Sequence, residues 1–381
     1  MIYLDNAATT YPKPSQVIEA VTDFMTRVGG NPARAGHMMS VEASRIVYDA
    51  REQIAELVGI RDPLRVVFTA NCTAAINLAL RGLLTAGDHV ITTSVEHNSV
   101  MRALMCMVRD GIRLSVVQSS PEGFVEPEQI KSEIQSDTRM VVIAHASNVL
   151  GCLQQVSEIG QICREAKVLL LVDSAQTLGA IPLNMVDDHI DLLAFSGHKS
   201  LYGPQGTGGL VVGDHVDVSS IKPIICGGTG SRSESDQHPS FLPDALEPGT
   251  LNSPGAAGLG AGVRFVLSLG IQAIRQHGMK LTLRLLNGLS EIPGVTIYGP
   301  KVSNMRVPVV SFNIGDMDPS RVALELEERF EIMCRAGLHC APAAHKTAGT
   351  FPRGSVRFGL SWFNTEQEID TALQAVRELA K

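Results

Sequence analysis

The segment DLLAFSGHKSLYGPQGTGG, residues 191–209, joins an apolar strand to a glycine-rich loop and carries a lysine at the junction. The run 192–195 is typical of a buried strand, and Ser196, His198 and Lys199 follow it closely. A lysine side chain normally keeps its ammonium in water and is almost never fully buried without a partner. Because open parallel sheets bind ligands at the carboxyl ends of their strands, we interpret Lys199 as a reactive residue at such an edge.

Short apolar runs alternate with segments of helical period over residues 60–215. The runs lie at 66–68, 89–92, 114–117, 140–144, 168–172, 192–195 and 210–212, and helices are expected to begin near Thr73, Asn98, Pro127 and Ser157. Nearly continuous apolar strands separated by helices are typical of parallel sheets buried on both faces. The sequence therefore predicts an α/β fold with a mostly parallel, seven-stranded sheet.

A second, smaller unit is predicted after this core. An amphipathic helix at 15–28 precedes the core, and the Gly-, Pro- and Ser-rich stretch 226–262 indicates a long irregular connection. The pattern then restarts with a helix from Val263, a strand at 307–314, a helix at 319–330, a strand at 354–359 and a helix from Thr365. We expect a large domain of residues 15–255 and a small α+β domain of residues 1–14 and 256–381.

Composition narrows the class of protein. The 381 residues are 44% hydrophobic and carry a net charge of −7 without a basic tract, which argues against nucleic acid or an anionic membrane as partner. No apolar run approaches the roughly 18 residues of a membrane helix, and the N-terminus does not resemble a secretory signal, so we expect a cytoplasmic protein. The seven cysteines form no C-x-x-C pair, so neither a metal site nor a disulfide framework is predicted.

Asp173 ends another apolar run and supplies a possible partner for Lys199. Alone, a carboxylate at a strand end is more often a helix cap or half of a salt bridge. An acid and a lysine at neighbouring strand ends, however, match a cofactor with a positive ring nitrogen and an aldehyde. Pyridoxal phosphate has both groups, so we expect Asp173 to pair with its pyridinium and Lys199 to form its Schiff base.

The phosphate of such a cofactor needs a cradle of donors. In FTANCTAAINLAL, residues 68–80, a strand and a small polar turn lead into a helix that begins near Cys72 and Thr73. The N–H groups and dipole of a helix start bind a dianion, although a threonine there is more often only an N-cap. The other phosphate motifs are not met, since G-x-x-x-x-G-K-[ST] does not occur and GLGAG at 258–262 does not follow a strand.

Eight short motifs extend this interpretation over the whole chain. They are YLDNAATT (3–10), EHNS (96–99), SNVLG (147–151), VDSAQ (172–176), SGHK (196–199), GPQGTGGL (203–210), EPGT (247–250) and RAGLHC (335–340). In these motifs and their order the chain resembles the class V aminotransferase-type pyridoxal-phosphate enzymes, in particular the cysteine desulfurase and selenocysteine lyase family. The resemblance implies a fold-type I pyridoxal-phosphate-dependent transferase.

The resemblance also implies a role for each matching residue. Lys199 would carry pyridoxal phosphate, Asp173 would hold its ring nitrogen, Gln176 its ring hydroxyl, and His97 would stack on the ring. Cys72, Thr73, Ser196 and His198 would surround the phosphate, and Thr250 would reach it from the second subunit of a homodimer. Asn148 and Arg357 would bind the substrate carboxylate, with Arg335 lining the substrate pocket.

Cys340 distinguishes among the reactions that this cofactor permits. In the family a cysteine after R-x-G-x-H attacks the substrate sulfur, so the resemblance implies that cysteine becomes alanine and Cys340 a persulfide. We expect Arg335 and His339 to favour the thiolate form of Cys340. The short segment after Cys340, stiffened by Pro342, is similar to the SufS-like group of the family.

Several alternatives stay open at this stage. A selenocysteine lyase would not need the thiol, and a lyase that releases free sulfide would not need a sulfur-acceptor protein. Another class V aminotransferase or an epimerase would use the same cofactor without Cys340. A cofactor-free lysine enzyme would need Lys199 but not Asp173, and a binding scaffold would need neither.

Overall fold

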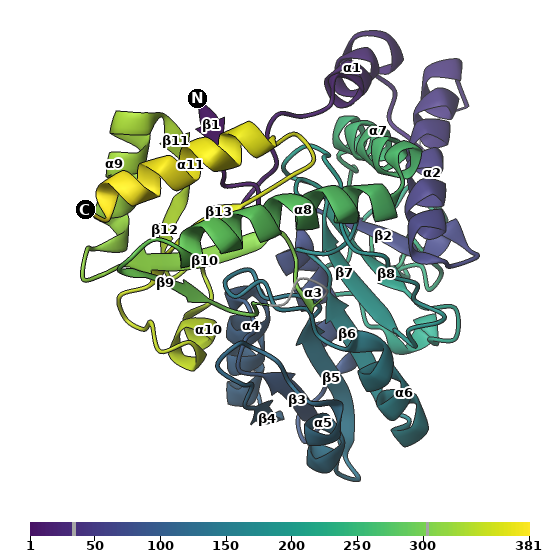
Figure 1. The fold of residues 1–381 in the computed structure, drawn as a ribbon. Coiled ribbons are helices and arrows are strands. Elements are labelled where there is room, and N and C mark those ends of the chain that lie inside the picture. Colours follow the sequence, from purple (N-terminus) through teal and green to yellow (C-terminus); the bar gives the residue numbers. More distant parts are fainter. Residues whose placement is uncertain (33–35, 302–304) are drawn as a thin grey trace.

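A seven-stranded sheet forms the centre of the larger part of the molecule (Figure 1). The computed structural model describes residues 1–32, 36–301 and 305–381. The strand order is β2 (Val66–Thr69), β8 (Gly208–Val212), β7 (Leu192–Ser196), β6 (Leu169–Asp173), β5 (Thr138–Ala144), β3 (His89–Thr93) and β4 (Arg113–Val117). Only β8 runs antiparallel to its neighbours in this sheet. The predicted mostly parallel α/β sheet is confirmed.

Hydrophobic side chains leave this sheet alternately toward two separate cores. In β7, Leu193 and Phe195 belong to one core, whereas Leu192 and Ala194 belong to the other. The first core is closed by α2 (Met38–Val58), α5 (Pro127–Glu133), α6 (Val156–Ala166) and α7 (Ser253–Leu269), and the second by α3 (Cys72–Leu83) and α4 (Asn98–Arg109). Burial on both faces explains why these strands are almost continuously apolar in sequence.

The helices outside the sheet differ from the prediction in three places. The helix predicted at 15–28 is α1 (Ser15–Asp23), which continues as one π-helical stretch, η1 (Phe24–Val28). Helix α2 was not predicted from the sequence. The connection predicted to end at 262 ends at Asn252, whose side chain caps α7 by accepting a hydrogen bond from the Gly255 N–H.

The GLGAG sequence that looked like a loop is part of α7 because its glycines permit close packing. A Cβ on Gly262 would lie 2.1 Å from the Leu201 carbonyl oxygen, and one on Gly258 would lie 2.6 Å from Val21. Helix α7 therefore lies directly against the Lys199 loop and α1. The energy gained from this packing outweighs the poor helix propensity of glycine.

A four-stranded antiparallel sheet organises the second part of the molecule, which Figure 1 shows beside the N- and C-termini. Its order is β12 (Arg335–Gly337), β13 (Ser355–Gly359), β10 (Val309–Ile314) and β9 (Val295–Tyr298). Three helices, α8 (Ile271–Ser290), α9 (Pro319–Phe330) and α11 (Glu366–Leu379), share its hydrophobic core. The N-terminal strand β1 (Ile2–Tyr3) joins this part by pairing with β11 (Ile332–Met333). This part has a hydrophobic core of its own, and the division into two domains with its boundaries stays a prediction.

Within the described ranges, no single helix is long and apolar enough to cross a bilayer. Helices α7 and α8 meet the length and composition criteria only as a pair, and the chain bends by 80° between them.

A buried ion pair fixes the long connection that leads into α7. Arg51 in α2 donates two hydrogen bonds to the Glu247 carboxylate, at 2.7 and 2.5 Å, and also bonds to the Val66 carbonyl. Glu247 in turn accepts the N–H of Phe68, and the Arg51 guanidinium lies 4.5 Å from the centre of the Phe68 ring. Both charged side chains are almost fully buried, at 6% and 10% exposure. This pair joins α2, β2 and the segment that carries Thr250.

We expect Glu247→Ala to lower the free energy of unfolding by about 3–5 kcal/mol, because it leaves the Arg51 charge buried without a partner. The double variant Arg51→Met, Glu247→Leu removes both charges and should lose clearly less stability. Urea unfolding of the three proteins measures the difference. Equal losses in the single and double variants would contradict this explanation.

Glu96 is a second buried acid, placed at the turn after β3. Its carboxylate accepts the N–H of Ala144 at 2.9 Å and the hydroxyl of Thr93 at 2.6 Å. The side chain is fully buried, and burial raises its pKa from 4.5 to about 8. At neutral pH the folded protein therefore holds a proton on Glu96 that the unfolded chain releases.

This proton predicts a pH dependence of stability. Because the folded state binds it more tightly, the contribution of Glu96 to stability is lost as the pH rises from about 4.5 to about 8. Glu96→Gln keeps a hydrogen-bonding group without the charge, so its stability should decline less over this interval than that of the wild type. Urea unfolding at about pH 6 and about pH 8 tests this, and parallel pH profiles would contradict it.

Candidate active site

A cavity of about 190 Å³ lies where β2, β3, β5, β6 and β7 end. Each of these strands contributes residues at or just after its carboxyl end. The cavity is lined by Asn71, Cys72, Thr73, Val95, His97, Ser99, Ala144, Ala146, Asn148, Asp173, Ala175, Gln176, Ser196, His198 and Lys199. The parallel sheet thus brings together side chains from five separate segments, as expected for a ligand site at its carboxyl edge.

Lys199 enters this cavity from the loop after β7. Burial lowers its pKa, and the nearby positive charges of Arg357 and Arg335 act in the same direction, whereas Asp173 opposes them. A lower pKa leaves more of the amine neutral and nucleophilic at physiological pH. The side chain therefore has the properties required for imine chemistry.

The N-terminal segment holds the backbone on either side of Lys199. The His198 carbonyl accepts hydrogen bonds from Thr9 Oγ1 at 3.1 Å, from the Thr10 N–H at 3.2 Å and from Lys13 Nζ at 2.8 Å. Thr10 Oγ1 also donates to the Lys199 carbonyl at 3.0 Å. The TTYPK sequence after β1 thereby fixes the backbone position of Lys199.

Asp173 lies at the end of β6 and is held by three donors. Its Oδ1 accepts from the Cys72 thiol at 3.3 Å and the Ala175 N–H at 2.9 Å, and its Oδ2 accepts from Ser99 Oγ at 3.3 Å. Burial, followed by the charge of Asp173, raises the pKa of Cys72, so Cys72 is a protonated thiol that donates to the acid. The carboxylate keeps acceptor capacity on its cavity side.

His97 is the N-cap of α4 and presents a neutral ring to the cavity. Its Nδ1 accepts the Ser99 N–H at 3.0 Å, and burial lowers the pKa of the imidazole to about 4. A neutral aromatic ring in a fixed orientation can stack on another flat ring.

Hydrogen-bond donors line the end of the cavity at the start of helix α3. Helix α3 begins there with Asn71 as its N-cap, and its first N–H groups have no partner within the helix. Thr73 and Ser196 add hydroxyl groups to the lining. The buried Nδ1 of His198 has no hydrogen-bond partner in the described structure. An anionic group fits this donor set, and pyridoxal phosphate has such a group at the required end.

Gln176 and Asn148 occupy the wall between the cavity and the second part of the molecule. Gln176 Nε2 donates to the Ala7 carbonyl at 3.0 Å. Asn148 Nδ2 donates to the His339 carbonyl at 2.7 Å, and the Asn148 carbonyl accepts from Arg357 Nη1 at 3.1 Å. Asn148 therefore links the lysine cavity to the cysteine segment.

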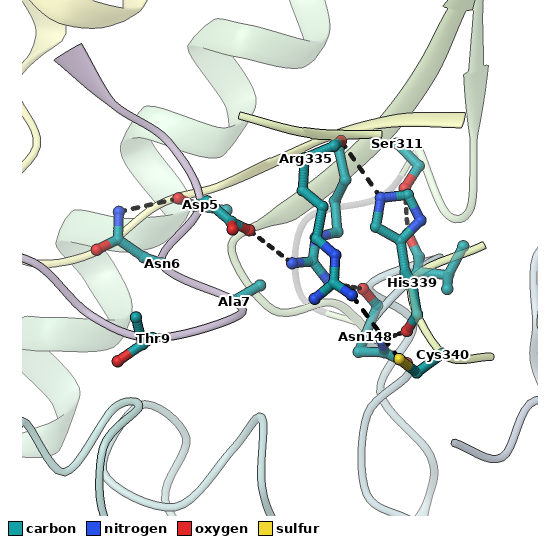
Figure 2. Close-up of polar contacts among 12 residues, drawn as sticks. Asp5, Asn6, Ala7, Thr9, Asn148, Ser311, Arg335, His339 and Cys340 are labelled. Carbon is teal, nitrogen blue, oxygen red and sulfur yellow. Dashed lines mark hydrogen bonds and ion pairs between the residues drawn. The ribbon is translucent and has the colours of Figure 1, made fainter. Parts of the chain in front are cut away.

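Cys340 is exposed and lies in a strained turn beside that wall (Figure 2). His339 and Cys340 have φ angles of +50° and +57°, a left-handed conformation that costs about 1–3 kcal/mol for each non-glycine residue. The Cys340 carbonyl accepts the N–H of Asn98 at 2.8 Å, which secures the turn to α4. Arg335 Nη2 approaches Cys340 Sγ to 3.7 Å. The guanidinium of Arg335 is thus a direct neighbour of the Cys340 sulfur.

His339 does not assist the thiolate, contrary to the expectation from sequence. Its Nε2 bonds to the Arg335 carbonyl at 3.3 Å and its Nδ1 to His345 Nε2 at 3.3 Å. Burial, assisted by Arg357, lowers the pKa of this ring to about 2. A neutral ring whose two nitrogens are both engaged supplies no positive charge to Cys340.

Arg357 lies in the centre of β13, and its side chain is almost fully buried, at 1% exposure. Nη2 pairs with Asp5 Oδ1 at 2.7 Å, and Nε has no partner in the described structure. Burial lowers the pKa of the guanidinium, whereas Asp5 raises it. Unused donor capacity remains beside Asn148 for a second carboxylate.

Thr250 is exposed and does not line the lysine cavity of its own chain. It lines a separate, mainly apolar cavity of about 370 Å³, formed with Thr69, Ala74 and Gly206 among others. In this arrangement Thr250 does not reach a phosphate bound in the lysine cavity of its own chain.

Four further residues shape the site without having been predicted from the sequence: Asp5, Lys13, Glu96 and His345. Asp5 and Glu96 stand within the quoted motifs YLDNAATT and EHNS, which was the available signal. Lys13 and His345 lie outside all eight motifs, and no spacing marked them. Their roles depend on contacts between distant segments.

The sequence of this chain is similar to those of known proteins. The family model described as "Aminotransferase class-V" matches residues 2–372. A probable cysteine desulfurase of Methanothermobacter thermautotrophicus is 35% identical over 100% of this chain and 94% of its own length. The cysteine desulfurase IscS of Vibrio campbellii is 32% identical over 99% of this chain and 92% of its own.

Solved structures agree with the sequence relatives. The apo structure of a cysteine desulfurase from Thermococcus onnurineus NA1 has a TM-score of 0.93 and 32% identity, covering 100% of this chain and 94% of the other. The cysteine desulfurase CsdA of Escherichia coli, solved with an S-sulfonic acid, has a TM-score of 0.88 and 26% identity over 99% of this chain and 94% of its own. The chain therefore belongs to the class V aminotransferase family of enzymes, alongside the cysteine desulfurases.

Proposed function

We propose that this enzyme is a pyridoxal-phosphate-dependent cysteine desulfurase, which converts L-cysteine to L-alanine and transfers the sulfur to Cys340 as a persulfide. The observation that carries this proposal is the placement of the exposed Cys340 thiol. It lies 3.7 Å from Arg335, on a segment hydrogen-bonded to Asn148, and Asn148 also lines the cavity of Lys199. A nucleophilic thiol beside a lysine site is what sulfur removal requires and what simple transamination does not.

The cavity residues divide between the two ends of the cofactor. Lys199 would hold it covalently, Asp173 would keep its ring nitrogen protonated, Gln176 would contact the ring hydroxyl, and the neutral ring of His97 would stack on it. Thr73, Ser196, His198 and the start of α3 with Cys72 would bind the phosphate. When bound, pyridoxal phosphate supplies an electron sink for charge that develops at the substrate α-carbon.

The protein side chains supply the remaining steps. Arg357 and Asn148 would bind the substrate carboxylate, and the neutral amine of Lys199 would take the α-proton. Cys340, with Arg335 beside its sulfur, would attack the substrate sulfur as a thiolate, so that an S–S bond forms as the Cβ–S bond breaks. The protons that complete alanine come from the substrate α-carbon, the thiols and water. The reaction balances as cysteine plus enzyme thiol giving alanine plus enzyme persulfide, without an external reductant.

The partners follow from the same geometry. The exposure of Cys340 would leave a persulfide accessible to a sulfur-acceptor protein. The exposed position of Thr250, outside its own cavity, supports a homodimer in which it completes the cradle of the second subunit.

Cys340→Ser should lower alanine formation from L-cysteine by more than about 100-fold, because the hydroxyl is a much poorer nucleophile toward sulfur. Alanine and sulfide are measured in a reaction without a keto acid, with a thiol reductant to discharge the persulfide. The visible absorption of the bound cofactor should be unchanged in the variant. Undiminished turnover of cysteine would overturn the persulfide step.

L-Selenocysteine provides a second arm of the same experiment. Turnover of selenocysteine in both proteins, with cysteine ignored, would identify a selenocysteine lyase instead. Absence of alanine from both substrates, with racemisation or amino transfer observed, would identify another class V activity.

Thr250→Val should weaken retention of pyridoxal phosphate by about 10-fold or more, since a hydrogen bond to a charged group contributes about 1.5–3 kcal/mol. Equilibrium dialysis measures the retention, and sedimentation should show a dimer for both proteins. A monomer that retains the cofactor at full strength would contradict the role of Thr250.

A further inference from the structure

A line of buried hydrogen bonds runs from Thr350 to the strand that carries Arg335. His345, in helix α10 (Pro342–Thr347), bonds through Nδ1 to Thr350 Oγ1 at 2.7 Å and through Nε2 to His339 Nδ1 at 3.3 Å. His339 Nε2 continues the line to the Arg335 carbonyl at 3.3 Å, a contact visible in Figure 2. The two rings stack at 5.5 Å with an interplanar angle of 18°.

The direction of this line is set by its last member. A carbonyl oxygen only accepts, so His339 must carry its proton on Nε2. The Nδ1 of the neutral ring is then an acceptor, which requires the proton of His345 to be on Nε2 as well. His345 Nδ1 consequently accepts, and the Thr350 hydroxyl donates to it at 2.7 Å and not to the His345 carbonyl, which lies farther away at 3.3 Å. Each of the two histidines can bond to both of its neighbours in only one tautomer.

The line includes two residues that lie next to Cys340, Arg335 and His339. Arg335 receives it through its carbonyl and approaches the Cys340 sulfur with its guanidinium. His339 precedes Cys340 in the left-handed turn, and its carbonyl is held by Asn148. A non-glycine pair in this conformation persists only where its surroundings secure it. His345 is fully buried, and its hydrogen bond to His339 orients the His339 ring toward the Arg335 carbonyl.

We propose that His345, held by Thr350, is a positioning residue for the Cys340 thiol. It does not touch the thiol; it fixes the tautomer and orientation of His339, which fix the strained turn and Arg335. The inference rests on the proposed desulfuration, in which Cys340 must be aligned with the substrate sulfur. Loss of the line should slow attack by the thiol without changing how the substrate carboxylate is bound.

The test compares His345→Leu with His345→Gln in the cofactor-loaded enzyme. The glutamine Nε2 retains an N–H for His339, whereas leucine retains only the volume. For alanine formation we expect kcat to fall about tenfold in His345→Leu, with KM for L-cysteine within about twofold, and kcat in His345→Gln to stay within about threefold of wild type. A wild-type kcat in His345→Leu, or equal loss in both variants, would overturn the proposal.

Thr350 provides a second pair in case leucine at 345 prevents folding. Thr350→Val should lower kcat about threefold, and Thr350→Ser, which keeps the hydroxyl, should restore it. Equal activity of these two variants would also overturn the role of the line.

A spectroscopic measurement separates this inference from the proposed function. In the holoenzyme with ¹⁵N-labelled histidine, long-range proton–nitrogen spectra should show both His339 and His345 protonated on Nε2. The signals that disappear in the spectrum of His345→Gln belong to His345, which assigns the signals of that ring. A proton on Nδ1 of either ring would contradict the line even if cysteine is desulfurated. Correct tautomers without alanine formation would leave the hydrogen-bonded line intact but overturn the proposed function, and with it the role of the line in desulfuration.

Discussion

The carbonyl group of His198 connects the two halves of this molecule. It directly precedes Lys199, and it accepts hydrogen bonds from Thr9, Thr10 and Lys13 of the N-terminal segment. That segment begins as β1, which pairs with β11 in the smaller part. The position of Lys199 is therefore determined by both parts together. A displacement of one part relative to the other would move the amine within its cavity.

A second connection crosses the same boundary on the side of the thiol. Asn148 belongs to the loop after β5, yet it binds the backbone of His339 and receives Arg357 from β13. The lysine comes from the large sheet and the cysteine from the strand–helix junction of the smaller part. Chemistry that needs both groups can occur only when these two surfaces meet, which explains the polar character of the wall between them.

Charge is distributed in this site so that most titratable groups are neutral. Burial lowers the pKa of His97 and His198 to about 4, and it lowers that of Lys199 as well. Neutral rings can stack and donate without repelling a positive cofactor nitrogen, and a neutral amine can act as a base. The guanidinium charges of Arg335 and Arg357 lie on the side of the thiol and of the expected substrate carboxylate.

The sequence by itself determined the parallel sheet and most of the cavity, because both depend on local pattern. Apolar runs such as 192–195 and the polar residues that follow them predict strand ends, and parallel strands bring those ends to one edge. Tertiary structure alone decided the longer helix α7, the neutral state of His339, and the roles of Lys13 and His345. The glycines of α7 are favourable only because atoms of other segments approach them too closely for a side chain. The direction of the histidine hydrogen bonds depends on a carbonyl four residues before His339 and on a hydroxyl eleven residues after it. Such contacts leave no periodic trace in the chain, since they arise only when the fold has closed.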